Sequence, residues 1–302
     1  MIKVQFLGTS GSVPTEKRGM PAVYLEFRGN RMLFDCGEGT QRQMRIAKIP
    51  FMKLDAIFIS HLHADHCLGL GGLLQTMDLF GRNNQLKIFG PKGISDTLEQ
   101  IITTGHFVLE GFDLELNEIK SRKLSTIYST NGSLVKCARL DHNVPSLGFS
   151  FEEKERRPFD KQKALKLGVQ EGPLFSRLQQ GNQVRVGKRV VKPDDVLGEA
   201  VKGRKVTYIP DTRPCAAAIE LAMGSDLLIH EATFAHDLQE SAIEGRHTTA
   251  QEAAEVAKRA KVKQLYLNHI SQRYTNAKVL EEEAKAIFPN TKVAEDFDKV
   301  EI

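Results

Sequence analysis

The sequence contains no tryptophan and only four cysteines, Cys36, Cys67, Cys137 and Cys215, which lie far apart and form no C-x-x-C pair. This spacing argues against a disulfide framework and against a cysteine zinc site. It predicts buried, reduced thiols, which suit a reducing compartment. The sequence also lacks any run of about 18 apolar residues and any N-terminal apolar segment long enough for a signal peptide. We therefore expect no membrane span and a cytoplasmic location.

The chain carries little net charge, +4 over 302 residues, but the charge is unevenly placed. Residues 152–204 contain thirteen Lys or Arg against eight Asp or Glu, a surplus of +5, so the rest of the chain is close to neutral. The same segment is interrupted by Gly and Pro and has few apolar runs, which predicts an excursion from the main body. Such a surplus indicates an anionic partner, with nucleic acid the leading candidate. On charge alone, a solvated surface loop of mixed charge is the favoured explanation of the segment.

Ten short apolar runs have the length and composition of β-strands. They are residues 2–7, 22–27, 31–36, 56–60, 86–90, 133–140, 147–151, 205–209, 226–230 and 264–269. Residues 28–30, Arg-Gly-Asn, predict a hairpin turn. Helix patterns lie between many of the runs; we expect Ser95 to cap one helix, and Thr248 with Gln251 to form a capping box at the start of another. This order predicts an α/β protein with two sheets covered by helices on their outer faces.

The stretch SHLHADH, residues 60–66, crowds three imidazoles and a carboxylate between a strand pattern and a helix pattern. Packing gives no reason to cluster four ionisable groups, so we interpret His61, His63, Asp65 and His66 as metal ligands. His61 and His63 point to the same side of an extended segment, whereas Asp65 and His66 lie where the chain turns into the helix. Because the two pairs do not easily share one ion, the stretch predicts two ions side by side.

Further ligands are expected beyond the ends of other strands. His142, Asp211 and His269 each lie at or just past the C-terminal end of a predicted strand, as the first cluster does. Active sites of layered α/β proteins gather beyond the carboxyl ends of strands. A lone His or Asp is more often structural than a ligand, but beside the first cluster these three residues complete a seven-ligand centre. Imidazole and carboxylate accept several metals, so zinc, manganese and iron all stay open.

The first cluster resembles the H-x-H-x-D-H signature of the metallo-β-lactamase superfamily, and the whole chain resembles the tRNase Z family, whose members trim the 3′ end of precursor tRNA. The matching stretches follow one another over nearly the full length: FLGTSGSVPTEKR (6–18), LFDCGEGTQRQ (33–43), SHLHADHCLGLGGLL (60–74), LDHNVPSLGF (140–149), GPLFSRLQQG (172–181), YIPDTRP (208–214), HEATF (230–234), HTTA (247–250) and NHISQRY (268–274). The signature alone would specify only the superfamily; GPLFSRLQQG, HEATF and HISQRY make the narrower identification. Ala64, Gly71 and Gly19 depart from the Gly, Pro and Asn usual in the family, and none of them is a ligand.

The resemblance implies an αββα sandwich in which residues 1–302 form a single metallo-β-lactamase domain with two Zn²⁺ per subunit. Transferred residue by residue, it assigns the seven ligands to a first ion (His61, His63 and His142), a second ion (Asp65, His66 and His269) and a bridge between them (Asp211).

The resemblance also implies the catalytic roles. Asp65 orients the attacking water and accepts its proton, His247 protonates the leaving 3′-oxygen, and Glu231 orients His247. The expected products are a tRNA with a 3′-hydroxyl and a trailer with a 5′-phosphate.

In the family, the counterpart of residues 152–204 is a flexible arm that grips the tRNA elbow, remote from the metals. The phosphate contacts expected here are Lys154, Arg156, Arg157, Lys161, Lys163 and Lys166. Such contacts follow the shape of tRNA rather than its sequence. Outside the arm, we expect Lys17 and Arg18 to contact the end of the acceptor stem, and Ser271 and Arg273 to contact phosphate.

The partners that the resemblance implies are precursor tRNA and a second copy of the chain, whose arm serves the other subunit's site; neither DNA nor a membrane is expected. Two alternatives stay open. A small-molecule phosphodiesterase or another hydrolase of the same fold would use much the same ligands, although the basic arm argues against it. A non-enzymatic RNA-binding module would have no need of every expected ligand.

Overall fold

The computed structural model describes residues 1–121 and 123–302. The chain divides into two compact units: Met1–Glu152 together with Lys205–Ile302 form the main unit, and Glu153–Arg204 form a smaller unit, which we call the arm. The arm is inserted between two antiparallel strands of the main unit, β10 (Leu147–Glu153) and β13 (Lys205–Ile209). Their pairing already extends to Glu152 and Lys205, so the sheet is complete without the inserted residues.

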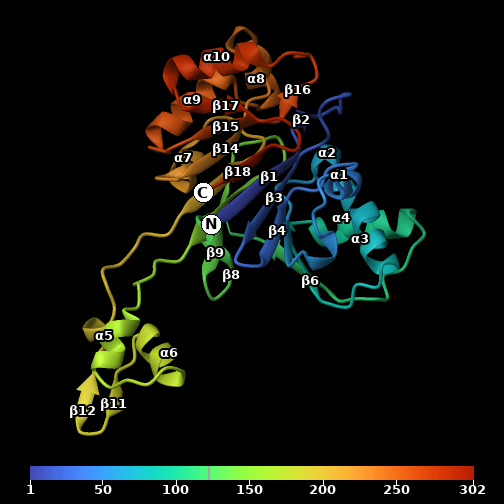
Figure 1. The fold of residues 1–302 in the computed structure, drawn as a ribbon. Helices are drawn as coiled ribbons and strands as arrows, with labels where there is room; N and C mark the ends of the chain where they lie inside the picture. The colour runs from blue at the N-terminus through green and yellow to red at the C-terminus, as the bar shows by residue number, and fades with distance from the viewer. Residues whose placement is uncertain (122) are drawn as a thin grey trace. The chain divides into compact units, whose positions relative to one another are not determined.

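Two seven-stranded mixed sheets form the main unit (Figure 1). The strands of the first sheet are, in spatial order, β18 (Lys299–Glu301), β1 (Ile2–Gly8), β3 (Ala22–Phe27), β4 (Asn30–Phe34), β5 (Ala56–Phe58), β6 (Leu86–Pro91) and β7 (Leu114–Ile119). Those of the second sheet are β17 (Thr291–Val293), β15 (Leu265–Asn268), β14 (Leu227–Glu231), β13, β10, β9 (Ser133–Arg139) and β8 (Ser125–Ser129).

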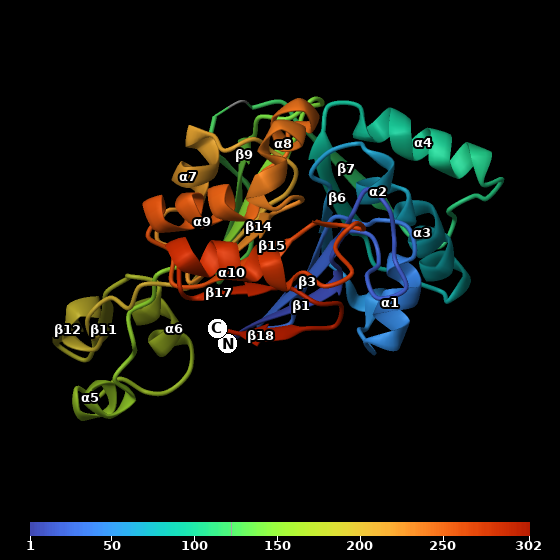
Figure 2. The same ribbon diagram turned by 90° about the horizontal axis from the view of Figure 1, so that it is seen from above.

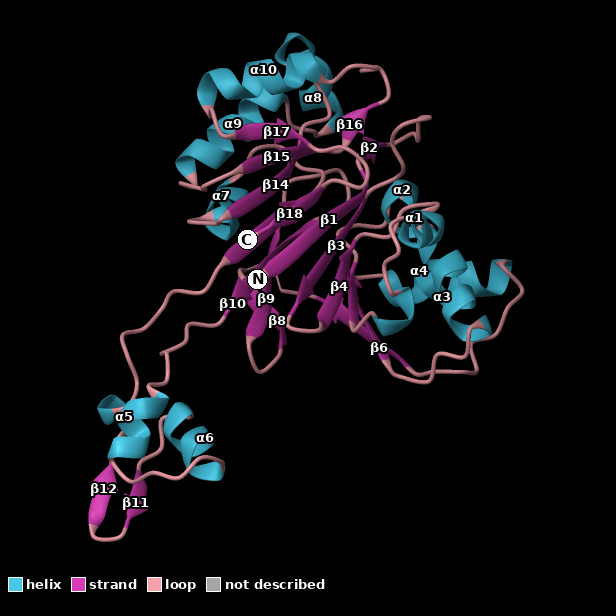
Figure 3. Ribbon diagram, in the orientation of Figure 1, coloured by secondary structure: helices cyan, strands magenta, loops and turns pink. Residues whose placement is uncertain are grey.

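Helices cover the outer face of each sheet (Figures 2 and 3). The first sheet is covered by α1 (Thr40–Ile46), α3 (Gly69–Leu79) and α4 (Ile94–Thr104). The short helix α2 (Ala64–Cys67) directly precedes α3. The second is covered by α7 (Ala216–Ala222), α9 (Ala250–Arg259), which α8 (Gln239–Gly245) precedes, and α10 (Lys278–Ile287). The expected αββα sandwich is confirmed. None of the helices in the described part of the chain is long and apolar enough to cross a membrane.

Strand β5 shows why the central strands read as continuous apolar runs. Ala56 and Phe58 face the second sheet, in a core that also contains Phe149 and Tyr208. The alternating residues Ile57 and Ile59 face the helices instead, beside Leu70 and Leu73 of α3. Because both faces of the strand are covered, neither face carries polar side chains.

The ten predicted strands are all present, and the Arg-Gly-Asn turn joins β3 and β4, with Phe27 paired to Asn30. Both predicted helix caps are wrong. Helix α4 starts after Gly93, whose φ of 98° favours glycine, rather than at Ser95. Helix α9 has its capping box one residue later than predicted, between Thr249 and Glu252, because the Thr248 hydroxyl is buried and donates to the Thr212 carbonyl at 2.5 Å.

The arm has a small apolar core of its own, formed by Ala164, Val169, Leu178, Val184, Val191 and Val196. It contains α5 (Lys161–Lys166), α6 (Pro173–Gln179) and a hairpin of β11 (Val184–Val186) and β12 (Arg189–Val191). Asp160 caps α5 by accepting a hydrogen bond from the Lys163 amide at 2.9 Å. Residues 152–204, predicted from composition as an excursion, therefore contain a folded unit rather than a plain loop.

Replacing Phe58 tests the core between the sheets. Its ring is fully buried and stacks on Phe34 and Phe89, with centroids 5.1 and 5.0 Å apart. We expect Phe58→Ala to lower the free energy of unfolding by about 3–5 kcal/mol, measured by urea denaturation. Leu79→Ala, at a side chain that is 78% exposed, is the control and should change it by less than about 0.5 kcal/mol. Equal effects would contradict this packing.

Candidate metal centre

The seven side chains predicted as metal ligands meet beyond the ends of the strands. Within each sheet, β4, β5 and β6 run parallel, as do β13, β14 and β15, so their C-terminal ends lie at a common edge. His61, His63, Asp65 and His66 follow β5, and His142, Asp211 and His269 follow β9, β13 and β15. Because each of these residues follows a strand that ends at this edge, the seven side chains form a single cluster in space.

Asp211 lies between two groups of imidazoles. Its Oδ2 atom is 3.6 Å from His61 Nε2 and 3.9 Å from His142 Nε2. Its Oδ1 atom is 3.3 Å from His66 Nε2 and 3.2 Å from His269 Nε2. Each carboxylate oxygen therefore faces one group, which is the arrangement that a bridging ligand requires.

The remaining two of the seven side chains complete the groups. His63 Nδ1 lies 3.1 Å from His61 Nε2 and 3.4 Å from His142 Nε2, so it belongs to the first group. Asp65 Oδ2 lies 3.5 Å from His66 Nε2 and 3.4 Å from His269 Nε2, so it belongs to the second. The ligand atoms of each group lie within 4.8 Å of one another. The partition is the same as the one that the resemblance implies.

Acceptors hold the outer ring nitrogens of His66 and His142. His66 Nδ1 donates to Asp35 Oδ2 at 2.7 Å, and His142 Nδ1 donates to the Arg246 carbonyl at 2.9 Å. A ring nitrogen that donates carries a hydrogen, so in the neutral imidazole the lone pair lies on the other nitrogen, Nε2, which faces the cluster. Histidine metal ligands are oriented in this way.

Two buried atoms of the cluster show that the residues fit a divalent ion. His66 Nε2 and Asp211 Oδ1 have no hydrogen-bond partner among the described residues. Buried polar atoms without partners are costly, and a shared cation would satisfy both. Burial alone would raise the pKa of Asp211, but the imidazoles of His269 and His66 lower that pKa well below its ordinary value. This direction favours the ionised carboxylate, which is the form that binds a metal ion.

Asp35 belongs to this centre although it was not among the predicted residues. It is fully buried and accepts hydrogen bonds from Ser60 N, Ser60 Oγ and Tyr208 OH at 2.7, 2.9 and 2.8 Å, besides the one from His66. Its φ of 57° is uncommon for a residue other than glycine. A carboxylate directly after β4, in the stretch LFDCGEG, was the signal that could have found it.

His247 and Glu231 form a pair beside the second group. His247 Nδ1 lies 3.2 Å from Glu231 Oε1, and the Thr212 amide donates to the same oxygen at 2.9 Å. Burial opposes the charged form of His247, but Glu231 and then Asp211 outweigh it and raise the pKa of His247 to about 9. An imidazole that is protonated at neutral pH and held by a buried carboxylate can act as a general acid.

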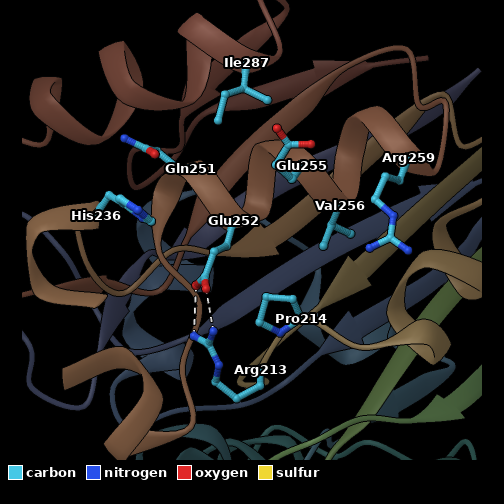
Figure 4. Close-up of a pocket in the computed structure, with 9 residues that line it drawn as sticks. All are labelled: Arg213, Pro214, His236, Gln251, Glu252, Glu255, Val256, Arg259 and Ile287. Atoms are coloured by element: carbon cyan, nitrogen blue, oxygen red, sulfur yellow. Dashed lines mark hydrogen bonds and ion pairs between the residues drawn. The ribbon is translucent and has the colours of Figure 1, made fainter. Parts of the chain in front are cut away.

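The loop that carries His247 is fixed from outside by Arg213. The guanidinium donates to the His247 carbonyl and forms a two-pronged ion pair with Glu252 of α9. Arg213 and Glu252 line a pocket of about 310 Å³ on the outer side of α9, together with Arg259 and Ile287 (Figure 4). None of the nine residues that line this pocket belongs to the metal centre, so we regard it as separate from the chemistry.

The segment that contains Lys17 and Arg18 lies against the second group. The amide of Ser12, which has a φ of 60°, donates to Asp65 Oδ2 at 2.9 Å. Lys17 is exposed. Arg18 instead points into the protein, where Nη1 donates to Thr9 Oγ1 and to the Ala294 carbonyl, both at 2.6 Å. The structure therefore places Arg18 as an anchor of the loop rather than as a free cation.

Ser271 and Arg273 differ in exposure to solvent. Ser271 belongs to β16 (Ile270–Ser271), which follows His269 and pairs with β2 (Ser10–Gly11). Only 5% of Ser271 is exposed. Arg273 is exposed, and its guanidinium lies 5.0 Å from the centre of the Phe234 ring. That ring lies 6.0 Å from the ring of His247. Of the two residues, only Arg273 offers its side chain to a ligand.

The predicted cations of the arm are all exposed, but two of them form ion pairs within the arm. Lys154, Arg156, Arg157, Lys161, Lys163 and Lys166 are all exposed. Arg157 holds the arm together, because it pairs with Asp194 at 2.6 Å and donates to the Gly198 and Leu197 carbonyls. Lys161 pairs with Glu171 at 2.6 Å. Six further exposed cations of the arm were not among the predicted contacts: Arg177, Arg185, Lys188, Arg189, Lys192 and Lys202.

The two sheets, their helices and the His/Asp cluster define a hydrolase of the metallo-β-lactamase fold. Residues 158–270 match the family model described as Beta-lactamase superfamily domain, and residues 2–164 match the one described as Anti-Pycsar protein Apyc1. The second match ends before Asp211 and His269, so full-length relatives decide the family.

Three relatives cover essentially the whole chain. Ribonuclease Z of Methanothermobacter thermautotrophicus is 46% identical over 100% of this chain and 97% of its own length. Ribonuclease Z of Archaeoglobus fulgidus is 45% identical over 100% and 98%. The crystal structure of human tRNase Z, short form, superposes with a TM-score of 0.72 at 30% identity and covers 99% of both chains. The chain belongs to the ribonuclease Z family of endoribonucleases.

Substitutions at Ser12 test whether the loop backbone orients Asp65. Ser12→Pro removes the amide hydrogen and cannot adopt a φ of 60°. We expect it to weaken divalent-metal binding by about 10-fold or more, measured by competition with a chromophoric chelator. Ser12→Gly keeps the amide and tolerates the same φ, so it should bind metal as the unsubstituted protein does. Equal affinities for the two variants would show that the contact is incidental.

Proposed function

We propose that the protein is a zinc-dependent endoribonuclease that removes the 3′ trailer from precursor tRNA. The proposal is carried by one observation: a complete His/Asp centre and a separately folded basic arm occur in a single chain of the ribonuclease Z family. The centre supplies phosphodiester chemistry, and the arm supplies affinity for a large folded polyanion. A small-molecule phosphodiesterase would need only the first of these.

The metal part of the proposal assigns the two groups of ligands to two Zn²⁺ ions, with Asp211 between them. Bound there, the ions would supply Lewis-acid stabilisation of charge on the scissile phosphate and a supply of ionised water at neutral pH. Imidazole and carboxylate donors suit zinc, and they also accept manganese or iron. Measuring the metal content of the purified protein by elemental analysis decides among the three metals.

The protein's own groups carry the proton transfers. Asp65, held by the Ser12 amide, orients the attacking water and accepts its proton. The new bond joins the water oxygen to phosphorus, and the bond from phosphorus to the 3′-oxygen breaks. His247, held by Glu231, gives its proton to that oxygen. The products are a tRNA with a 3′-hydroxyl and a trailer with a 5′-phosphate.

The arm binds the tRNA by contacts to phosphate. Its exposed lysines and arginines neutralise backbone charge and read no base edges, which suits an enzyme that accepts every tRNA. Lys17 and Arg273 are the exposed cations of the main unit for which we propose contacts nearer the cleavage site. Arg18 and Ser271 act through the protein scaffold, as anchors of the segments that carry Ser12 and His269.

A homodimer and a cytoplasmic location complete the proposal. The homodimer is the assembly that the family resemblance implies, and light scattering of the purified protein measures it directly. The cytoplasm is where precursor tRNA is made in cells without a nucleus, and the four free cysteines suit its reducing conditions.

Cleavage of a tRNA extended at its 3′ end tests the function. We expect cleavage directly after the tRNA body, loss of cleavage with a chelator, and recovery when zinc is restored. His247→Ala should lose about 10²–10⁴-fold in rate, because a general acid contributes that much, while it keeps two metal ions. The assignment of His247 fails if the variant retains only one ion. Hydrolysis of a small phosphodiester without cleavage of tRNA would point to the small-molecule enzyme instead.

Replacing the arm with a short Gly-Ser linker between Glu153 and Arg204 tests substrate binding. Because β10 and β13 pair without the arm, the main unit should stay folded. We expect precursor tRNA cleavage to fall far more than hydrolysis of a small chromogenic phosphodiester. Equal losses of the two activities would rule out this role for the arm.

The salt dependence of tRNA binding gives a finer test of the arm cations. The double substitution Lys163→Ala and Lys166→Ala should reduce the slope of affinity against salt concentration by about one unit per cation. Lys258→Ala on α9 is the matched control and should leave the slope unchanged.

A further inference from the structure

Thr233 follows β14 directly, and its hydroxyl lies among three functional side chains. Thr233 Oγ1 is 2.8 Å from Glu231 Oε2, 2.9 Å from His269 Nδ1 and 3.3 Å from His247 Nδ1. Only 4% of Thr233 is exposed, so water does not compete for these contacts. One hydroxyl therefore touches a proposed metal ligand, the proposed general acid and the carboxylate that holds that acid.

Counting hydrogens fixes the direction of these bonds. A hydroxyl donates one hydrogen bond and accepts two, and an ionised carboxylate only accepts. Both oxygens of Glu231 act as acceptors, for the Thr212 amide at 2.9 Å and the Thr233 amide at 3.2 Å. Burial raises the pKa of Glu231, but His247 outweighs burial and lowers it, which favours the ionised carboxylate. Thr233 must then donate its single hydrogen to Glu231. The bond between Thr233 and His269 is therefore made with the hydrogen on His269 Nδ1.

This direction decides which form of His269 is present. With the hydrogen on Nδ1, the lone pair of a neutral imidazole lies on Nε2. Nε2 is the atom that faces Asp211 Oδ1 at 3.2 Å and Asp65 Oδ2 at 3.4 Å. The Thr233 hydroxyl thus selects the form of His269 that a metal ion needs, while it shares a carboxylate with the general acid.

We propose that Thr233 is a positioning residue that joins the metal centre to the Glu231–His247 pair, so that metal binding by His269 and proton donation by His247 depend on one hydroxyl. The proposal rests on the proposed function for the role of His247. It does not make Thr233 a catalytic residue, because its hydroxyl touches only protein groups.

Ser60 provides an internal comparison. Its hydroxyl donates to the buried carboxylate of Asp35 at 2.9 Å and lies 3.0 Å from His61 Nδ1. The same device, a hydroxyl between a buried carboxylate and a histidine ligand, thus serves the first group. The difference is that Asp35 holds no general acid, whereas Glu231 holds His247.

Thr233→Val and Thr233→Ser separate the hydroxyl from the size of the side chain. Metal-free protein is titrated with Zn²⁺ against a chromophoric chelator. We expect Thr233→Val to bind the weaker of its two ions about 10–100-fold less tightly than the unsubstituted protein does, and Thr233→Ser to restore most of that affinity. Thermal unfolding of the metal-free proteins checks that both variants fold. The proposal is overturned if Thr233→Val keeps full affinity, or if Thr233→Ser is no better than Thr233→Val.

A second comparison tests the link to His247. With precursor tRNA and saturating Zn²⁺, Lys258→Ala on α9, an exposed residue outside the site, should keep the kcat of the unsubstituted protein. Thr233→Val should stay at least 10-fold low in kcat with KM little changed, since His247 and Glu231 have lost a shared partner. Full recovery of Thr233→Val at saturating Zn²⁺ would disprove the link. If the unsubstituted protein cleaves no precursor tRNA, the proposed function fails, while the metal titration still tests the bond to His269.

Discussion

The contacts of the Asp211 carboxylate with imidazoles on both sides are the interaction on which the site depends. Moving a lone carboxylate into a protein interior costs several kcal/mol, and Asp211 is only 2% exposed. Imidazoles of two groups surround it, one group at each oxygen. The strands that end at this edge bring those groups together, and the imidazoles of His269 and His66 lower the pKa of the carboxylate against the effect of burial. The αββα sandwich holds the imidazoles in position around Asp211.

The sequence predicted which side chains meet in the His/Asp cluster, and it predicted the layer architecture, because both have local signatures. Clustered ionisable side chains after a strand need no knowledge of distant contacts, and strands buried on both faces appear as apolar runs. The four strands of the two large sheets that were missed are β7, β8, β17 and β18, which are the four sheet edges. Edge strands are short, polar and partly exposed, so they lack the pattern by which the central strands were found.

The residues that sequence reasoning missed or placed differently all act through long-range contacts. Asp35 and Thr233 lie in stretches that match the family, but their contacts in the site form only when His66 and His269 are brought to them. Arg18 looked like a free cation in an exposed loop, but the guanidinium reaches Ala294, more than 270 positions away. A charge predicts an ionic contact, whereas the partner of that charge is set by the fold.

The two hydroxyl-carboxylate pairs show how one local device can serve two ends. Ser60 with Asp35 and Thr233 with Glu231 each fix the hydrogen of a histidine on its outer nitrogen. Holding a histidine alone needs nothing more than this. In the second pair, Thr233 binds Oε2 of Glu231, and the other oxygen, Oε1, contacts His247. In the proposed enzyme, the step from binding metal to supplying a proton therefore requires one additional imidazole, His247, at the carboxylate that also holds Thr233.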